Sequence, residues 1–192
     1  MPRTGDGHSV PRRAPVKQES QMRILLTEEQ IAEKVRYLGA RLSDDYREKN
    51  PLLIGCLKGC VVFLADLMRA ISVPHAIGFV RTSTYGAGQS SSGVVRADLF
   101  DVNVRARHAV IVEDIVDTGL TLAYLTEALA KQAPSSLKVC ALLVKPGAYQ
   151  APVTIDYKGF DIPDDFVVGY GLDWGERYRD LPYVAVVDEQ DA

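Results

Sequence analysis

Cysteine is scarce in this sequence, and its three residues form no redox or metal-binding pattern. Cys56, Cys60 and Cys140 cannot all pair with one another, and the first two are not spaced as the CxxC of a redox pair. The three histidines are scattered along the chain, so they do not complete a zinc site with these cysteines. We therefore predict reduced, mostly buried thiols, which are typical of a cytoplasmic protein.

Long apolar runs and an excess of positive charge are also missing. No window approaches the ~20 apolar residues of a membrane-spanning helix, and the N-terminus lacks the apolar segment of a secretory signal. The 22 basic and 25 acidic side chains give a net charge of −3. We therefore expect no membrane association, and the charge balance disfavours nucleic-acid binding.

One globular domain with an N-terminal tail accounts for the composition. Apolar residues make up 47% of the chain and charged residues 24%, values that exclude a wholly disordered protein. Residues 1–22 contain three Pro and two Gly and almost no consecutive apolar residues. Such a segment buries too little surface to offset the entropy of ordering, so we predict a disordered tail over 1–22 and a single domain over 23–192.

Hydrophobic periodicity predicts alternating strands and helices in the domain. Thr27 and Gln30 match a helix capping box, and the apolar residues that follow recur at helical spacing to about Asn50. Prolines and glycines interrupt residues 145–165, where we predict loops. Strands are predicted at 52–57, 79–84, 94–100, 108–112, 139–144, 166–169 and 184–187, and further helices at 61–71 and 122–132. This order is typical of an α/β fold with a mostly parallel twisted sheet flanked by helices.

The most informative segment follows the predicted strand at 108–112. This strand delivers two adjacent carboxylates, Glu113 and Asp114, and a short turn centred on Gly119 then opens a helix. Backbone N–H groups in such a turn converge on one point, and the hydroxyls of Thr118 and Thr121 and the positive end of the helix add to them. The turn therefore predicts a phosphate site, although it is not a Walker loop.

The two carboxylates would repel a phosphate unless they had other partners. They can accept hydrogen bonds from sugar hydroxyls, and they can hold a Mg²⁺ ion that also binds phosphate oxygens. The segment therefore suits a ribose phosphate that carries a second phosphate group on a metal.

The segment EDIVDTGLT, residues 113–121, resembles the phosphoribosyl-pyrophosphate signature of type I phosphoribosyltransferases and, within that family, the hypoxanthine-guanine branch. The resemblance implies that family's fold, in which a small hood subdomain binds the base. It also implies that Glu113 and Asp114 bind the ribose hydroxyls and the metal. The residues implied to bind the 5′-phosphate are Asp117, Thr118, Gly119, Leu120 and Thr121.

Two further segments resemble loops of the same family. Leu57-Lys58-Gly59 is similar to the pyrophosphate loop, which in the family contains a non-proline cis peptide. Ser83-Thr84-Tyr85, together with the Gly/Ser-rich stretch 86–93, is similar to the flexible lid that closes over the reacting centre. Such a lid would exclude water, which competes with the base for the activated sugar.

The resemblance also extends to the purine pocket. It implies that Lys145 donates to the 6-oxo oxygen, that Phe166 stacks on the purine ring, and that the Val167 backbone binds the ring edge. Asp173 is implied to lie in this pocket as the ligand of a second Mg²⁺, and Arg179 to contact pyrophosphate. Trp174 departs from the family pattern, which more often has Tyr there.

The implied activity is purine salvage by a homo-oligomeric, cytoplasmic enzyme, a dimer or a tetramer. Hypoxanthine or guanine would displace pyrophosphate from phosphoribosyl pyrophosphate, giving IMP or GMP, with Asp117 as general base. The side chains do not rank the two bases. The alternative is a non-catalytic regulator of the same fold that binds nucleic acid, which would require a basic patch and would lack the general base.

Overall fold

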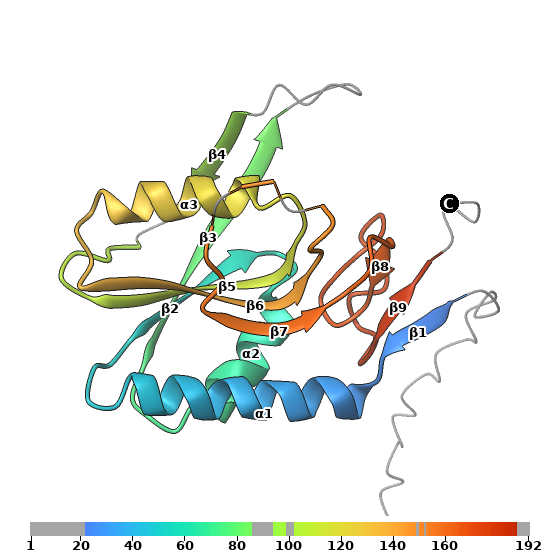
Figure 1. The fold of residues 1–192 in the computed structure, drawn as a ribbon, viewed down its shortest axis with the longest axis horizontal. Coiled ribbons are helices and arrows are strands. Elements are labelled where there is room, and N and C mark those ends of the chain that lie inside the picture. Colours follow the sequence, from blue (N-terminus) through green and yellow to red (C-terminus); the bar gives the residue numbers. More distant parts are fainter. Residues whose placement is uncertain (1–21, 86–93, 99–101, 149, 152, 188–192) are drawn as a thin grey trace, which may run out of the picture.

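The computed structural model describes residues 22–85, 94–98, 102–148, 150–151 and 153–187. Most of the predicted tail, residues 1–21, and the Gly/Ser-rich stretch 86–93 lie outside the described residues. Two sheets organise the described chain, a larger one flanked by helices and a smaller one beside it (Figure 1).

The larger sheet is parallel except at one edge, as predicted. Its strands, in sheet order, are β4 (Val94–Asp98), β3 (Ala76–Tyr85), β2 (Leu52–Leu57), β5 (His108–Val116), β6 (Ser136–Val144) and β7 (Tyr157–Asp161). Only the pairing of β3 with β4 is antiparallel among these six strands.

Helices cover both faces of this sheet. α1 (Glu28–Asp45) and α2 (Val61–Ala70) lie on one face and α3 (Leu120–Ala130) lies on the other (Figure 1). Side chains alternate across a strand. Val110 and Val112 of β5 accordingly belong to the apolar cluster that contains α1 and α2 residues, whereas Ile111 belongs to the cluster under α3.

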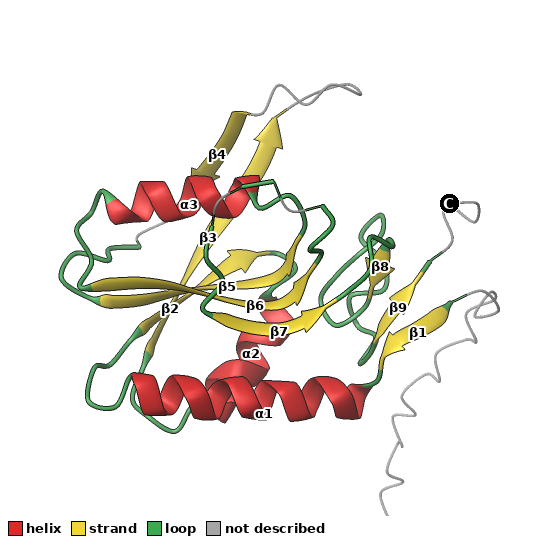
Figure 2. Cartoon of the chain, viewed as in Figure 1, coloured by secondary structure: helices red, strands yellow, loops and turns green. Residues whose placement is uncertain are grey.

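The smaller sheet forms the hood. It consists of β1 (Arg23–Leu26), β9 (Val184–Val186) and β8 (Val167–Val168), in that order and antiparallel. It lies beyond the carboxyl ends of the main-sheet strands (Figure 2). In an open α/β sheet ligands bind at this edge, so the hood is placed to close a ligand site.

Several sequence predictions are confirmed. Thr27 and Gln30 form the capping box at the start of α1. The three cysteines are free and buried, and burial raises the pKa of each thiol, so the thiols are protonated at neutral pH. No helix in the described part of the chain is long and apolar enough to cross a bilayer.

The predicted end of the first helix and the predicted loop over 157–161 are wrong, and the strands at 79–84, 108–112 and 139–144 are longer than predicted. α1 ends at Asp45 rather than near Asn50, because the chain turns after Tyr46 through left-handed residues at Glu48 and Asn50. Strand β7 was predicted as loop, because a short edge strand with charged residues and a glycine lacks a strong hydrophobic pattern.

Packing of α1 against α2 depends on a close approach at Gly39. A Cβ at this position would lie 2.6 Å from the Ala70 Cβ and 2.8 Å from its carbonyl carbon. We expect Gly39→Val to destabilise the fold by about 1–3 kcal/mol through overpacking, measured by urea unfolding. Gly147→Ala is the matched control, because nothing lies within 4 Å of an added Cβ there. Equal stability of the two variants would contradict the predicted contact.

Candidate active site

Strand β5 sends its two acids into different cavities. Glu113 lines a cavity of about 170 Å³ beside the start of α3, and Asp114 lines one of about 210 Å³ beneath the hood. Adjacent strand residues point to opposite sides, which separates the two carboxylates. Ile115 and Asp117 line both cavities, so the end of β5 forms the wall between them.

The smaller cavity has the form of an anion site. Gly119 takes a left-handed conformation with φ 76° and caps α3, so the backbone turns at the start of the helix. Asp117, Thr118, Gly119 and Thr121 line the cavity. The backbone N–H of Leu120 donates to the Thr118 hydroxyl oxygen at 3.4 Å, a long contact that leaves this N–H weakly engaged. Free N–H groups at a helix start bind anions, as predicted for this turn.

The larger cavity gathers residues that are far apart in the sequence. Lys145 follows β6, Phe166 and Val167 come from the hood, and Asp173 and Arg179 come from the segment between β8 and β9. All of them line the 210 Å³ cavity together with Gly59 and Asp114. The predicted base-binding residues therefore meet Gly59 and Arg179, two of the four predicted pyrophosphate-binding residues, in one place.

Burial makes the two carboxylates harder to ionise. Burial is the largest cause that raises the pKa of Glu113, and the neighbouring Asp114 charge adds to it. Burial also raises the pKa of Asp114, against the backbone N–H groups of Asp114 and Ile115 and the charge of Arg179, which lower it. The Oε2 atom of Glu113 is buried and has no hydrogen-bond partner. A cation or a hydroxyl donor from a ligand would satisfy this oxygen.

Lys145 and Asp117 form an ion pair in the larger cavity. The distance from Lys145 Nζ to Asp117 Oδ1 is 3.0 Å, and Asp164 Oδ1 lies at 3.7 Å from the same nitrogen. The lysine side chain is only 11% exposed. A buried ammonium beside a carboxylate places one donor and one acceptor at adjacent points of the pocket.

Phe166 is the aromatic residue that lines the larger cavity, and Trp174 packs against it without lining the cavity. Phe166 is 42% exposed and packs edge-on against Trp174, with ring centroids 6.2 Å apart and planes at 70°. An exposed ring face at the pocket provides a stacking surface for a planar ligand. Trp174 therefore supports Phe166, at the position where the sequence departs from the family pattern.

The segment after β2 approaches both Asp114 and the hood. The Leu57–Lys58 peptide bond is cis, which confirms the expectation from the resemblance. A Cβ at Gly59 would collide with the Asp114 carboxylate, and a Cβ at Gly171 would collide with the Gly59 carbonyl oxygen. A side chain is therefore excluded at Gly59, which lies against Asp114, and at Gly171, which lies against the Gly59 carbonyl.

Ion pairs join this segment to the hood. Lys58 Nζ lies 2.7 Å from Glu176 Oε1, and Arg179 Nη2 lies 3.4 Å from Glu176 Oε2. Arg179 also pairs with Asp173 at 2.7 Å, and its Nη1 donates to the Gly171 carbonyl at 2.8 Å. The Glu176 carboxylate thus bridges two cations that come from different parts of the chain.

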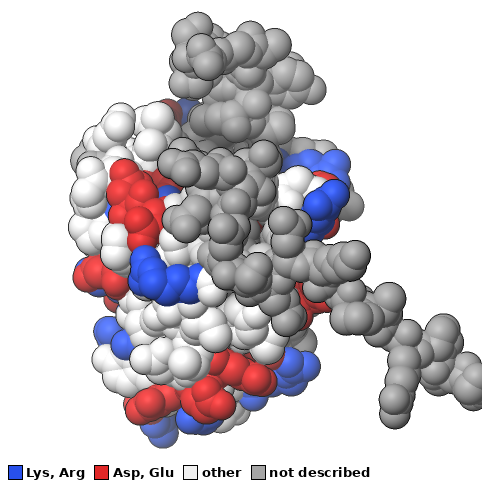
Figure 3. Space-filling model, turned by 90° about the vertical axis from the view of Figure 1, so that its right-hand side faces the viewer, with Lys and Arg blue, Asp and Glu red and all other residues white. Residues whose placement is uncertain are grey.

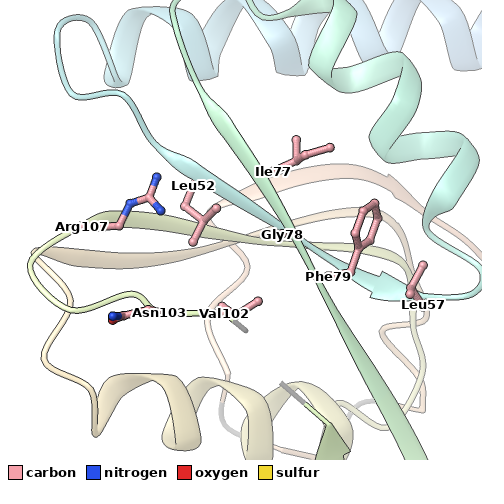
Figure 4. A pocket seen from close by; sticks show the side chains of 8 residues that line it. All are labelled: Leu52, Leu57, Ile77, Gly78, Phe79, Val102, Asn103 and Arg107. Atoms are coloured by element: carbon pink, nitrogen blue, oxygen red, sulfur yellow. The ribbon is translucent and has the colours of Figure 1, made fainter. Parts of the chain in front are cut away.

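Some predicted site residues lie elsewhere. Leu57 lines neither of these cavities but another of about 510 Å³, where it lies with Phe79 and Ile77 from β3 (Figure 4). Ser83, Thr84 and Tyr85, which are predicted to belong to a flexible lid, are the last residues of β3 and pair with β4. The remainder of the predicted lid, 86–93, is outside the described residues.

Sequence reasoning missed several residues of the site. Ile115 and Leu172 line the cavities but have apolar side chains that any core position could carry. Glu176 follows Asp173 by three positions and precedes Arg179 by three. The regular spacing of these three charged residues was the signal in the sequence that could have identified Glu176. A further cavity, of about 600 Å³, lies between α1 and β7 and contains none of the predicted site residues.

Comparisons with known proteins agree with this geometry. The model of the phosphoribosyl transferase domain matches residues 22–174. The chain belongs to the phosphoribosyltransferase family. The hypoxanthine-guanine phosphoribosyltransferase of Mycobacterium tuberculosis H37Rv is 52% identical over 173 residues, which cover 86% of this chain and 85% of that protein. The Bacillus subtilis enzyme of the same name is 46% identical over 167 residues, covering 86% of this chain and 92% of that protein.

Solved phosphoribosyltransferase structures share the fold. The crystal structure of a hypoxanthine phosphoribosyltransferase from Staphylococcus aureus superimposes with a TM-score of 0.84 at 39% identity. The match covers 89% of this chain and 94% of that one. The fold predicted from the sequence is therefore confirmed, and this phosphoribosyltransferase carries its candidate site where the hood meets the strand ends.

The contact of Gly59 with Asp114 predicts a sharp loss of activity on substitution. An added methyl group displaces the carboxylate, and a displacement of about 1 Å in an active site can cost about 10²-fold in rate. We therefore expect Gly59→Ala to lower kcat/KM for phosphoribosyl pyrophosphate by about 10²-fold. Gly147→Ala serves as the control again, and circular dichroism checks that both variants fold. Normal activity in Gly59→Ala would show that the Asp114 position is unimportant.

Proposed function

We propose that this enzyme transfers the 5-phosphoribosyl group from phosphoribosyl pyrophosphate to hypoxanthine or guanine, or to both, in purine salvage. The products would be IMP or GMP and pyrophosphate. The observation that carries the proposal is the Lys145–Asp117 pair in a cavity shared with Asp114, Phe166 and Arg179. The names of the relatives support the same substrates.

The pair suits the edge of a 6-oxopurine. The 6-oxo oxygen and the imidazole ring lie side by side on that edge, so a donor and an acceptor 3.0 Å apart can each bind one of them. Lys145 donates to the oxygen, Asp117 faces the imidazole, and Phe166 stacks on the ring. Adenine has an amino group in place of the oxygen, and this donor would oppose the ammonium of Lys145.

The reaction forms one bond and breaks another at the anomeric carbon of the ribose. The bond from this carbon to a pyrophosphate oxygen breaks, and a bond to a ring nitrogen of the purine forms. Asp117 removes the proton from the imidazole as this bond forms. The guanidinium of Arg179 and the ammonium of Lys58 stabilise the charge that develops on the departing pyrophosphate.

The carboxylates fit a magnesium ion. Hard oxygen ligands suit Mg²⁺, which proteins usually hold with one or two carboxylates plus substrate phosphates. Glu113 Oε2 is free to bind a cation, and the described residues contain no cluster of three acidic, His or Cys side chains that would hold a metal unaided. The resemblance assigns one ion to Glu113 and Asp114 and a second to Asp173; Glu113 lines the smaller cavity and the other two carboxylates line the larger one, so each cavity would offer a carboxylate to an ion. When bound, Mg²⁺ would neutralise charge on the pyrophosphate.

A regulator that binds nucleic acid fits the surface less well. Figure 3 shows acidic and basic side chains interspersed over the described part of the face that carries the hood, without a continuous basic surface. Nucleic-acid binding relies on such a surface. Asp117 in the larger cavity can serve as the general base that a regulator would lack.

The resemblance also supports a homo-oligomer, a dimer or a tetramer, in the cytoplasm. Ile77 and Val61 are 46% and 45% exposed, and apolar side chains of this size are often covered at subunit interfaces.

A panel of purine bases tests the proposed function. The protein is mixed with phosphoribosyl pyrophosphate, Mg²⁺ and hypoxanthine, guanine or adenine, and nucleotide formation is followed by chromatography. We expect IMP or GMP to form, and adenine to react with a kcat/KM at least ~10⁴-fold lower because the pocket would leave buried polar groups mispaired. EDTA should abolish the reaction, and added Mg²⁺ should restore it. Failure of every 6-oxopurine would refute the proposal.

Replacing Asp117 separates chemistry from binding. Asp117→Asn keeps the shape of the side chain but removes the proton acceptor, so we expect kcat to fall by about 10²–10⁴-fold. Binding of phosphoribosyl pyrophosphate, measured by calorimetry, should persist. Asp161→Asn is the matched control, because Asp161 pairs with Lys158 on edge strand β7, which lines neither active-site cavity. An unchanged kcat would exclude Asp117 as the base.

A further inference from the structure

We infer that Glu176 is an internal counter-anion of the pyrophosphate site. In the free protein its carboxylate pairs with Lys58 and Arg179. When pyrophosphate, free or as part of the substrate, binds between these two cations, they pair with pyrophosphate in place of Glu176. The inference rests on the proposed function, which assigns Lys58 and Arg179 to pyrophosphate. It concerns a residue to which neither the sequence analysis nor the comparisons gave a role.

The first observation is that each oxygen of the carboxylate faces a different cation. Oε1 lies 2.7 Å from Lys58 Nζ, and Oε2 lies 3.4 Å from Arg179 Nη2. Within the described residues Lys58 has no other ion pair. A pyrophosphate oxygen needs the same donors, so Glu176 and pyrophosphate compete for them.

The second observation is that the backbone fixes Glu176 in this position. Its N–H donates to Asp173 Oδ2 at 2.9 Å, and its φ of 64° is in the left-handed region. A non-glycine residue in this region is uncommon, and the surrounding contacts maintain it. The side chain is therefore directed to the two cations by the local fold rather than by chance on a mobile surface.

The third observation is the exposure of the contact. The side chain of Lys58 is 54% exposed and that of Glu176 is 66% exposed. Exposed ion pairs contribute little to stability, so this pair is a weak brace for the fold. The hood is joined to α2 by other contacts, such as the hydrogen bond of 2.6 Å from Tyr170 to Asp66. Glu176 can therefore release its partners without loosening the hood.

Two roles of Glu176, competing with pyrophosphate for the cations and holding the cations in position, predict opposite changes in pyrophosphate affinity for Glu176→Gln. If Glu176 competes with pyrophosphate, removing its charge frees Lys58 and leaves Arg179 paired, among the described residues, with Asp173 alone, and pyrophosphate binds more tightly. If Glu176 only positions Lys58 and Arg179, its removal lets them move, and pyrophosphate binds more weakly. The direction of the change in Kd separates the two roles.

The experiment titrates the full chain with pyrophosphate in the presence of Mg²⁺ by calorimetry. We expect Glu176→Gln to lower the Kd of pyrophosphate about five-fold, the range set by exposed ion pairs, and to lower the KM of phosphoribosyl pyrophosphate in the same direction. The gain should shrink in high salt, because screening weakens the competing charge. It should also shrink in a Lys58→Gln background, where one shared partner is missing.

Glu127→Gln is the control, because it breaks an exposed pair with Lys131 on α3 that lies outside the site. An equal or higher Kd in Glu176→Gln than in the wild type overturns the inference while leaving the proposed function intact, provided that the wild type binds pyrophosphate and forms nucleotide. Failure of the wild type to do either refutes the proposed function, and the inference fails with it.

Discussion

Two neighbouring carboxylates at the end of a buried strand impose the main constraint on this structure. Burial opposes the charge of Glu113 and Asp114, and each opposes the charge of the other. The strand sends them to opposite sides, backbone N–H groups and Arg179 partly compensate Asp114, and Gly59 leaves room for its carboxylate. The segment after β2, the turn at Gly119 and the hood all approach this pair, which makes the end of β5 the centre of the candidate site.

The candidate site is built from residues of both the main sheet and the hood. The main sheet supplies the turn at Gly119 and the two carboxylates of β5. The hood supplies Phe166, Val167, Asp173 and Arg179. The close approach of Gly171 to Gly59 and the hydrogen bond from Tyr170 to Asp66 hold the two parts together. Under the proposed function, the main sheet therefore binds the sugar phosphate and, through Lys145 and Asp117, one edge of the base, whereas the hood supplies the stacking ring of Phe166.

The sequence predicted those elements whose local signal is strong. The capping box at Thr27, the central strands and the turn at Gly119 all follow from residue pattern and turn chemistry. Strand β7 was missed because the pairing of an edge strand is decided by its neighbour rather than by its own residues. Glu176 and Lys58 are 118 positions apart in the sequence, and no local pattern predicts a contact between residues at that separation.

The hood sheet joins the two ends of the described chain, since Arg23 pairs with Val186 and Ile24 with Ala185. Every strand of the main sheet lies between these partners in the sequence. During synthesis the central layers are complete before β9 leaves the ribosome. A nascent chain therefore holds β1 and β8 before the strand that joins them exists, and a premature stop ahead of β9 yields a protein in which the hood sheet cannot form.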